Sequence, residues 1–376
     1  MGTTLILLYS FPVLLLIVFL AYCYHLGKFR DGILIGGVVV AICLMLVGCV
    51  QYTSAATAFA DTEVINGYIT AKNRNQGTYD ESYSCNCVTK YRTESYSTGS
   101  GKNRSTRTRR VSYQSCSTCY RKWFTVKWNC DSTIGQFSFG SVQSLLPTVY
   151  ATPNPVPFDL VKVGEPASRT LSYENYIQSS TYSLYNTRIK NSSAFGVLPE
   201  YPLAIHDLFK IDRFVNVGVK MDVAEVKVWN DEIAKVNSVV GPKKQGNVVF
   251  VLTQNQPMDY ADALEAKWEG VNKNDIVVVT NLDLTGNITW TKILSWTKAE
   301  DFKIAVRDRI NAVKVLDREK ILGIIQEEAV GKFERRKMAE FAYLKDELEI
   351  SSVVIGLLIA AIIFGFVVGG VIIRRQ

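Results

Sequence analysis

The chain has 376 residues, and its 42 Lys and Arg against 35 Asp and Glu give a net charge of +7. This length allows two ordinary domains plus membrane anchors. Its two histidines, His25 and His206, are too few for a histidine metal cluster or a histidine-based catalytic dyad. The apolar fraction of 48% is high because several long apolar runs contribute to it.

Three of these runs are long enough to cross a bilayer, whose core of roughly 30 Å needs about 20 helical residues. They cover residues 5–24, 33–50 and 353–373. Lys28 and Arg30 separate the first two runs, and Arg374 and Arg375 follow the third. Because cations flank membrane helices on the cytoplasmic side, both sites should face the cytoplasm. The sequence therefore predicts a multi-pass membrane protein with segment 51–352 on the periplasmic or extracellular side.

Two glycines in the third run, Gly365 and Gly369, have the G-x-x-x-G spacing that lets two membrane helices approach closely. They are candidates for a contact in a homo-oligomer. The alternative is that glycine is simply common in membrane helices.

The second run allows another interpretation of the N-terminal region. Lys28 and Arg30 precede an apolar stretch that ends in Leu46-Val47-Gly48-Cys49, which resembles a bacterial lipoprotein signal. Cleavage before Cys49 would leave a lipidated ectodomain. Lipoprotein processing at Cys49 is therefore an alternative to a transmembrane hairpin.

Five cysteines follow in a segment rich in Ser, Thr, Tyr and Val, a composition that favours strands and turns. Cys85 and Cys87 form a C-x-C pair, Cys116 and Cys119 form a C-x-x-C pair, and Cys130 stands alone. Such cysteines are either zinc ligands or disulfide partners. The predicted location outside the cytoplasm favours disulfides, with one cysteine left over.

The same segment holds the positive charge of the chain. Between residues 88 and 127, ten Lys and Arg face only Glu94, a net of +9, so the remainder of the chain carries −2. Aromatic residues lie between the cations, a combination suited to anionic lipid or envelope surfaces and to nucleic acid. The external location disfavours nucleic acid, and a solvated hairpin tip without a ligand is the alternative. The candidates for binding an anionic surface are Lys102, Arg104, Arg107, Arg109 and Arg110.

Segment 221–315 predicts an α/β core with the order helix, strand, helix, strand, strand, helix. Residues 248–252 and 276–279 are apolar and mostly β-branched, which is typical of strands buried on both faces. Gly241-Pro242 should end the first helix. In the second helix Tyr260, Leu264 and Trp268 recur at i, i+4 and i+8, so Trp268 should pack between its helix and the sheet.

The predicted fold class is a membrane protein with an α+β ectodomain: three transmembrane helices, a cysteine-rich mostly β segment, and an α/β core of the order αβαββα. Segment 316–352 is charge-rich and helix-prone, and predicts a stalk. The predicted boundaries are 1–51 for a transmembrane hairpin, 52–146 for the cysteine-rich basic segment, 147–220 for a Pro- and Tyr-rich mixed segment, 221–315 for the core, 316–352 for the stalk and 353–376 for the C-terminal transmembrane helix.

The core carries Val248-Val249-Phe250-Val251-Leu252, then Asp259-Tyr260-Ala261, Lys267-Trp268, Gly270 and Asn274-Asp275. In these residues it resembles the TPM domain family, described from the TLP18.3, Psb32 and MOLO-1 founding proteins of phosphatase. Members of that family are often membrane-tethered, and some are reported as acid phosphatases or divalent-ion binders. The resemblance therefore implies a site for a divalent cation such as calcium or magnesium. The family's arginine-bearing strand and Gly-rich turn have no counterpart in residues 283–290. The whole chain is also similar to uncharacterised membrane proteins of large tailed phages.

A phosphatase would need carboxylates that converge on a metal ion or a phosphate. The candidates are Asp259, Asp262 and Asp283, near the predicted strand ends where α/β sites usually lie. Helix capping and solvation explain each of them singly, and their spacing matches no metal motif. We therefore expect a binding or assembly module at the cell envelope without a cofactor, and a divalent-ion-dependent phosphatase is the alternative. Its expected partners are the lipid bilayer and either an anionic envelope surface or another membrane protein.

Overall fold

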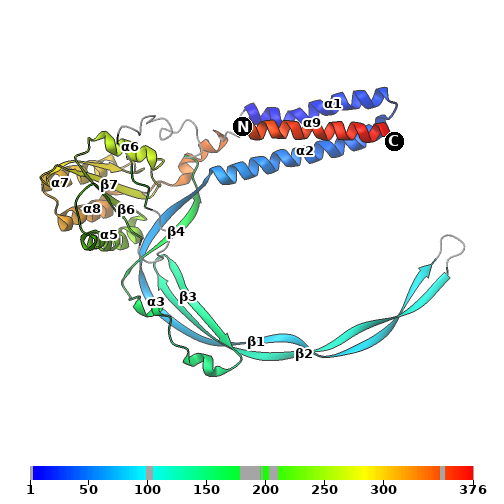
Figure 1. Ribbon diagram of the computed structural model, residues 1–376, viewed down its shortest axis with the longest axis horizontal. Coiled ribbons are helices and arrows are strands. Elements are labelled where there is room, and N and C mark those ends of the chain that lie inside the picture. The colour runs from blue at the N-terminus through cyan, green and yellow to red at the C-terminus, as the bar shows by residue number, and fades with distance from the viewer. Residues whose placement is uncertain are drawn as a thin grey trace. The chain divides into compact units, whose positions relative to one another are not determined.

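The computed structural model describes residues 3–98, 105–177, 195, 198–202, 211–347 and 352–375. They belong to two compact units. One unit combines Met1–Gly67 with Pro166–Gln376, and the other is Tyr68–Glu165. The first contains three long apolar helices and an α/β core, and the second is a β structure with a long hairpin (Figure 1).

Three helices of the first unit are long and apolar enough to cross a membrane, as predicted. They are α1 (Thr3–His25), α2 (Phe29–Ala58) and α9 (Ser352–Arg375). Their buried side chains pack against one another, and the rings of Phe19 and Phe366 meet edge to face with centroids 5.6 Å apart. A helix satisfies its own backbone hydrogen bonds, which suits such apolar runs to a bilayer.

Gly365 and Gly369 of α9 face α2 of the same chain. A Cβ added to Gly365 would lie 3.3 Å from Val39 Cγ1, and one added to Gly369 would lie 3.2 Å from Ile35 Cγ2. The small residues therefore let two helices of one molecule approach closely. Cys49 lies exposed inside the continuous helix α2, so lipoprotein processing there would cut this helix.

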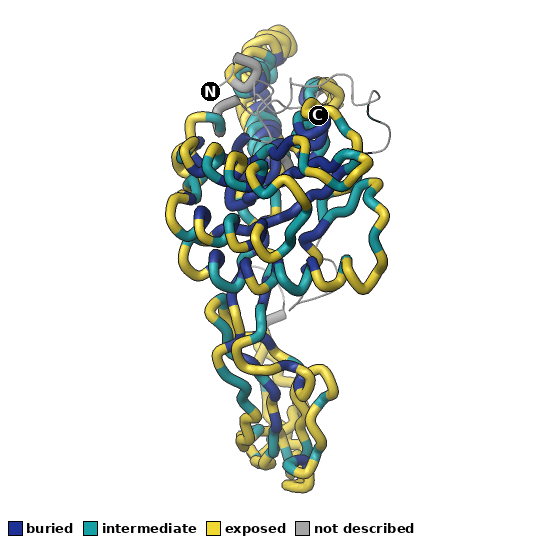
Figure 2. Tube along the Cα trace, turned by 90° about the vertical axis from the view of Figure 1, so that its left-hand side faces the viewer, coloured by how far each residue is buried: buried dark blue, intermediate teal, exposed yellow. Residues whose placement is uncertain are grey.

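The α/β core is a layered structure around a four-stranded sheet of order β5-β6-β7-β8. The strands are β5 (Phe214–Val217), β6 (Asn247–Gln254), β7 (Asp275–Leu282) and β8 (Ile288–Leu294). The first three are parallel, and β8 runs antiparallel to β7. The sheet is buried between helices, as the dark strands of Figure 2 show.

Helices cover both faces of this sheet. One face packs against α5 (Val223–Lys244), α7 (Glu300–Val313) and α8 (Arg318–Lys332), and the other packs against α6 (Asp259–Lys267). Alternate residues of a strand point to opposite faces. Accordingly Val248 and Phe250 belong to the first apolar cluster, and Val249 and Val251 belong to the second. The order α5, β6, α6, β7, β8, α7 confirms the predicted sequence of elements.

Trp268 is buried, as the spacing of Tyr260, Leu264 and Trp268 predicts, with 6% of its surface exposed. It follows α6 directly and belongs to the cluster that covers one face of the sheet. Its indole Nε1 donates a hydrogen bond to the Pro199 carbonyl at 2.9 Å, and its ring meets Tyr201 edge to face. The polar group of the tryptophan is therefore satisfied although the ring is buried.

The predicted end of the first core helix at Gly241-Pro242 is wrong. α5 continues to Lys244, and Gln245 closes it in a left-handed conformation with φ 56°. A proline in the last turn removes only one backbone hydrogen bond, which leaves the helix intact. Gly241 has a packing role instead, because a Cβ there would collide with the carbonyl of Asn66.

The predicted stalk at residues 316–352 is also wrong in its described part. Ile321 and Ile325 of α8 are fully buried in the core, and the chain leaves the helix at Phe333. A 3₁₀ helix, Met338–Glu347, then precedes residues outside the described part. Burial of an apolar face stabilises a helix more than its own propensity does, so these residues join the core.

The second unit is built on antiparallel strands. β1 (Ala60–Thr98) begins in the first unit, pairs with β2 (Ser105–Ser132), and β2 pairs with β3 (Gly135–Ser144). The sheet order is β3-β2-β1-β4, with β4 at Pro166–Glu174. A short 3₁₀ helix (Pro147–Ala151) and α3 (Val156–Leu160) follow β3. The predicted β character is confirmed, and the compact unit covers Tyr68–Glu165, since the 3₁₀ helix and α3 that follow β3 pack against this sheet.

Candidate functional site

The outer part of the β1–β2 pair is a two-stranded ribbon, residues 78–98 with 105–124, which we call the basic ribbon. β3 pairs with β2 only from Phe124 onward, so the described ribbon has no third strand. None of the side chains described at residues 78–96 and 106–124 is buried. Figure 1 shows the ribbon extending from its own unit. Two strands alone are at best marginally stable, so another interaction has to hold them together.

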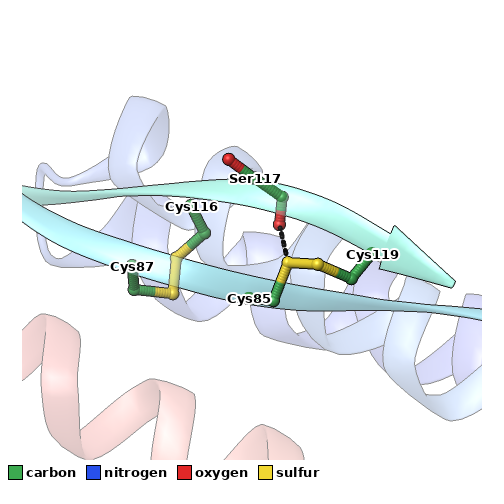
Figure 3. The surroundings of a disulfide bond; sticks show 5 residues. All are labelled: Cys85, Cys87, Cys116, Ser117 and Cys119. Atoms are coloured by element: carbon green, nitrogen blue, oxygen red, sulfur yellow. Dashed lines mark hydrogen bonds between the residues drawn. A yellow bond between two sulfur atoms is a disulfide. The ribbon is translucent and has the colours of Figure 1, made fainter.

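Two disulfides supply that interaction (Figure 3). Cys85 is bonded to Cys119, and Cys87 is bonded to Cys116, with Cα separations of 5.8 and 4.0 Å. They lie at a β-bulge between Cys85 and Val88, where Asn86 has φ 49°. Cross-links that close loops of this length stabilise by about 3–4 kcal/mol each, in the chain-entropy account. The disulfides therefore fix the pairing of the strands beyond the bulge.

The disulfide prediction is confirmed, and Cys130 is the cysteine left over. It is buried and unpaired, and burial raises the pKa of its thiol. Within the described residues, no three His, Cys, Asp or Glu side chains gather closely enough to hold a metal ion. Cys85, Cys87, Cys116 and Cys119 act as cross-links of the ribbon.

The strand register sorts the ribbon side chains onto two faces, because alternate residues of a strand point to opposite sides. On β2 the alternation is unbroken, so it carries each face past the bulge of β1. One face, the cation face, has the cations Lys90, Arg92, Arg107, Arg109 and Arg121. The opposite face, the hydroxyl face, has only Arg110 and Lys122. The described cations are therefore concentrated on one side.

Arginines of the cation face lie over aromatic rings. Arg92 lies 5.8 Å from the centroid of Tyr113, and Arg121 lies 5.3 Å from that of Tyr83. The hydroxyl face has one such pair, Arg110 over Tyr91 at 4.2 Å. A guanidinium on an aromatic ring keeps its N–H edges directed outward, where they can bind carboxylate or phosphate.

Two carboxylates bridge neighbouring groups of the cation face. Glu94 accepts hydrogen bonds from Arg92 and Arg109 at 2.6 and 3.2 Å, and these bonds lower its pKa. Glu81 accepts hydrogen bonds from Arg121 and from the Trp123 indole, both at 2.6 Å. Both bonds lower the pKa of Glu81, and the bond from Arg121 has the larger effect. Both carboxylates stay ionised at neutral pH and hold the cations in a fixed row.

The five residues predicted to bind an anionic surface do not form one cluster. Arg107 and Arg109 lie on the cation face, and Arg110 lies on the hydroxyl face. Lys102 and Arg104 lie outside the described residues. Lys90, Arg92 and Arg121 complete the cation face, although the sequence analysis did not single them out. Their period-2 spacing is visible in the sequence, but which cations of β1 and β2 share a face depends on the pairing of the two strands, which the sequence does not show.

Two of the three candidate catalytic carboxylates, Asp262 and Asp283, have separate partners. Asp262 forms an ion pair with Lys292 at 2.6 Å. Asp283 accepts bonds from the Thr285 hydroxyl and from the Asn287 backbone, which lower its pKa to about 2. Asp259 is exposed at the first residue of α6. The geometry therefore gives Asp262 and Asp283 local structural roles.

A buried polar cluster lies at the other end of the parallel strands. Asp275, the first residue of β7, accepts bonds from Asn247, from the Tyr201 hydroxyl and from the Asn272 backbone at 2.8–2.9 Å. Arg213 is 1% exposed and donates to Asn247. Burial raises the pKa of Asp275. These contacts connect β6 and β7 to the segment before β5, so the cluster holds the core together.

Neither known protein families, nor curated proteins, nor solved structures gave a match to this chain.

Proposed function

We propose that this chain is a membrane-anchored binding module that presents its basic ribbon to an anionic surface of the cell envelope. The observation that supports the proposal is the exposed ribbon, which two disulfides cross-link. Its seven described cations outnumber its three carboxylates, and none of these charged side chains is buried. A cationic element on a stable support attracts anionic partners through the local field. The α/β core, with the element order of the TPM resemblance, serves as the support.

The apolar helices α1, α2 and α9 anchor the module in this proposal. Lys28 and Arg30 between α1 and α2, and Arg374 and Arg375 at the end of α9, support a cytoplasmic location of these ends, because cations flank membrane helices on the cytoplasmic side. The ribbon then lies outside. Labelling of Ser95→Cys in intact cells by a membrane-impermeant maleimide tests this orientation. Labelling that requires lysis contradicts it.

Binding is tested with the full-length protein in nanodiscs of zwitterionic lipid, on a surface coated with dextran sulfate. Binding should weaken strongly as salt rises, since added ions screen exposed charges within about 8 Å at physiological strength. Neutralising Arg107, Arg109 and Arg110 to Gln should abolish most of it. The matched control neutralises Lys227, Lys235 and Lys243 of α5, which lowers the net charge equally. Equal losses in both variants would show that total charge, and not the ribbon, is responsible.

A further inference from the structure

The outer half of the basic ribbon, residues 88–98 with 105–115, has two chemically different faces. Its part of the cation face carries four cations against Glu94, together with aromatic and aliphatic side chains. The members are Lys90, Arg92, Arg107, Arg109, Tyr96, Tyr113, Val88 and Val111. Val88 is 55% exposed and Tyr96 is 44% exposed, so apolar surface lies open between the charges.

The hydroxyl face of the same half is almost uncharged. Arg110 is its one described cation, and most of its other positions carry short hydroxyl side chains. These are Thr89, Thr93, Ser95, Thr106, Thr108 and Ser112. The hydroxyl groups of these side chains can form hydrogen bonds with water. The outer half therefore combines an apolar and basic side with a hydrated side.

We infer that this outer half is an interfacial element whose cation face lies on the phosphate headgroups of an anionic phospholipid bilayer. The inference rests on the proposed function and names the surface that the ribbon binds. Lysines and arginines bind anionic headgroups, and tyrosine rings sit at headgroup level with the hydroxyl in water. Val88 and Val111 add apolar contact, and the hydroxyl face remains in solvent.

A nucleic acid fits this face less well. Single strands bind by stacking bases on open aromatic rings. Here Tyr113 lies under Arg92 and Tyr96 lies under Arg109, each at 5.8 Å. These rings already have a cation over them. Glu94 occupies the Nε and one Nη of Arg92 and one Nη of Arg109, and the remaining N–H groups of the two guanidiniums are suited to phosphate groups.

The first experiment compares two charge reversals on one strand. Full-length protein in phosphatidylcholine nanodiscs is mixed with phosphatidylcholine vesicles that contain or lack phosphatidylglycerol, and binding is measured by co-flotation. Arg107→Glu, on the cation face, should weaken binding to the anionic vesicles about thirty-fold, since each cation near the surface contributes to the affinity. Arg110→Glu changes the same charge three positions away on the hydroxyl face, and should weaken binding less than about three-fold. Equal losses would overturn the inference.

The second experiment locates the face that meets the bilayer. An environment-sensitive fluorophore is placed at Val88→Cys or at Thr89→Cys, neighbours on opposite faces, after replacement of the exposed Cys49 by Ser. Only the label at residue 88 should shift to the blue and be quenched by brominated lipid. Equal responses at both positions would contradict a single binding face.

Dextran sulfate separates the two levels of the proposal. Protein that binds dextran sulfate or single-stranded DNA but not the anionic vesicles leaves the proposed function standing and overturns the bilayer as its target. Protein that binds none of these surfaces overturns both.

Discussion

Glu63, which is buried, and Arg335, which is 22% exposed, form an ion pair across 272 positions of the sequence. Arg335 Nη2 lies 2.6 and 2.7 Å from the two carboxylate oxygens of Glu63, and Lys273 Nζ lies 3.4 Å from one of them. Glu63 follows α2 in the first residues of β1, whereas Arg335 follows α8 on the way to α9. The pair therefore connects the two segments of chain that lead to the apolar helices.

Breaking this pair should destabilise the core. Arg335→Ala leaves a carboxylate that is 6% exposed, with Lys273 as its remaining ion-pair partner among the described residues. Loss of one member of a fully buried pair costs about 3–5 kcal/mol, and the loss here should be smaller because Arg335 is 22% exposed. The melting temperature of the solubilised full-length protein should fall accordingly. Lys235→Ala removes the exposed pair with Glu232 and should change stability by less than about 1 kcal/mol. Similar falls in melting temperature for both variants would mean that the pair of Glu63 and Arg335 stabilises the protein no more than an exposed ion pair does.

Trp268→Ala should also be severe. The substitution removes a ring from the cluster under the sheet together with the hydrogen bond to Pro199, and such truncations cost about 3–5 kcal/mol. Lys267 is not a neutral control, because its ammonium bonds to the Leu198 carbonyl and to Glu200. Leu284→Ala, at a residue 78% exposed, is the better comparison in thermal unfolding. An unchanged melting temperature for Trp268→Ala would refute the packing of this ring.

Reduction should loosen the ribbon and leave the core folded. A variant with Cys85, Cys87, Cys116 and Cys119 all changed to Ser loses both cross-links. Closing the loop once is worth about 3–4 kcal/mol, and the second, nested cross-link adds less. Hydrogen–deuterium exchange at residues 88–98 and 105–115 should become fast, whereas β6 and β7 should keep their protection. Cys130→Ser provides the control, since this thiol is in no cross-link. Unchanged exchange in the outer ribbon would mean that strand pairing alone is sufficient.

Asp283 should make stability depend on pH. Hydrogen bonds from Thr285 and Asn287 lower its pKa to about 2 in the folded protein, whereas the pKa of an aspartate in an unfolded chain is about 3.9. A lowered pKa stabilises the folded state above the unfolded value, and this contribution disappears as the pH falls through about 2. Asp283→Asn should therefore melt below wild type at neutral pH, with the difference closing in acid. A difference that stays constant with pH would assign the effect to hydrogen bonding alone.

The order of elements in the core could be predicted because each element has its own local signal. The run 248–252 marks a buried strand, and the spacing that ends at Trp268 marks an amphipathic helix. β5 has only four residues, Phe214–Val217, which is too short for a periodicity argument. The position of α8 could not be predicted, since its stripe of apolar residues suits a stalk and a core helix equally.

Part of the candidate site could likewise be predicted from the sequence, and part could not. Cysteine spacing and net charge mark the ribbon in the sequence, but they do not reveal its faces. That assignment depends on which residue of β1 lies opposite which residue of β2, and a shift of one residue in this pairing would move the side chains of β1 to the opposite face. Within β2, alternation alone puts Arg109 and Arg110, adjacent in sequence, on different faces.

The length of the ribbon has an electrostatic consequence. Residues 78–98 of an extended strand reach roughly 70 Å, whereas salt screens exposed charges within about 8 Å. The cations near Arg107 are therefore insulated from the charges at the ribbon's own base. Substitutions at the far end can change the sign or the size of the charge there, and with it the partners that this end attracts. They do not alter the packing of Val126 and Trp128 at the near end.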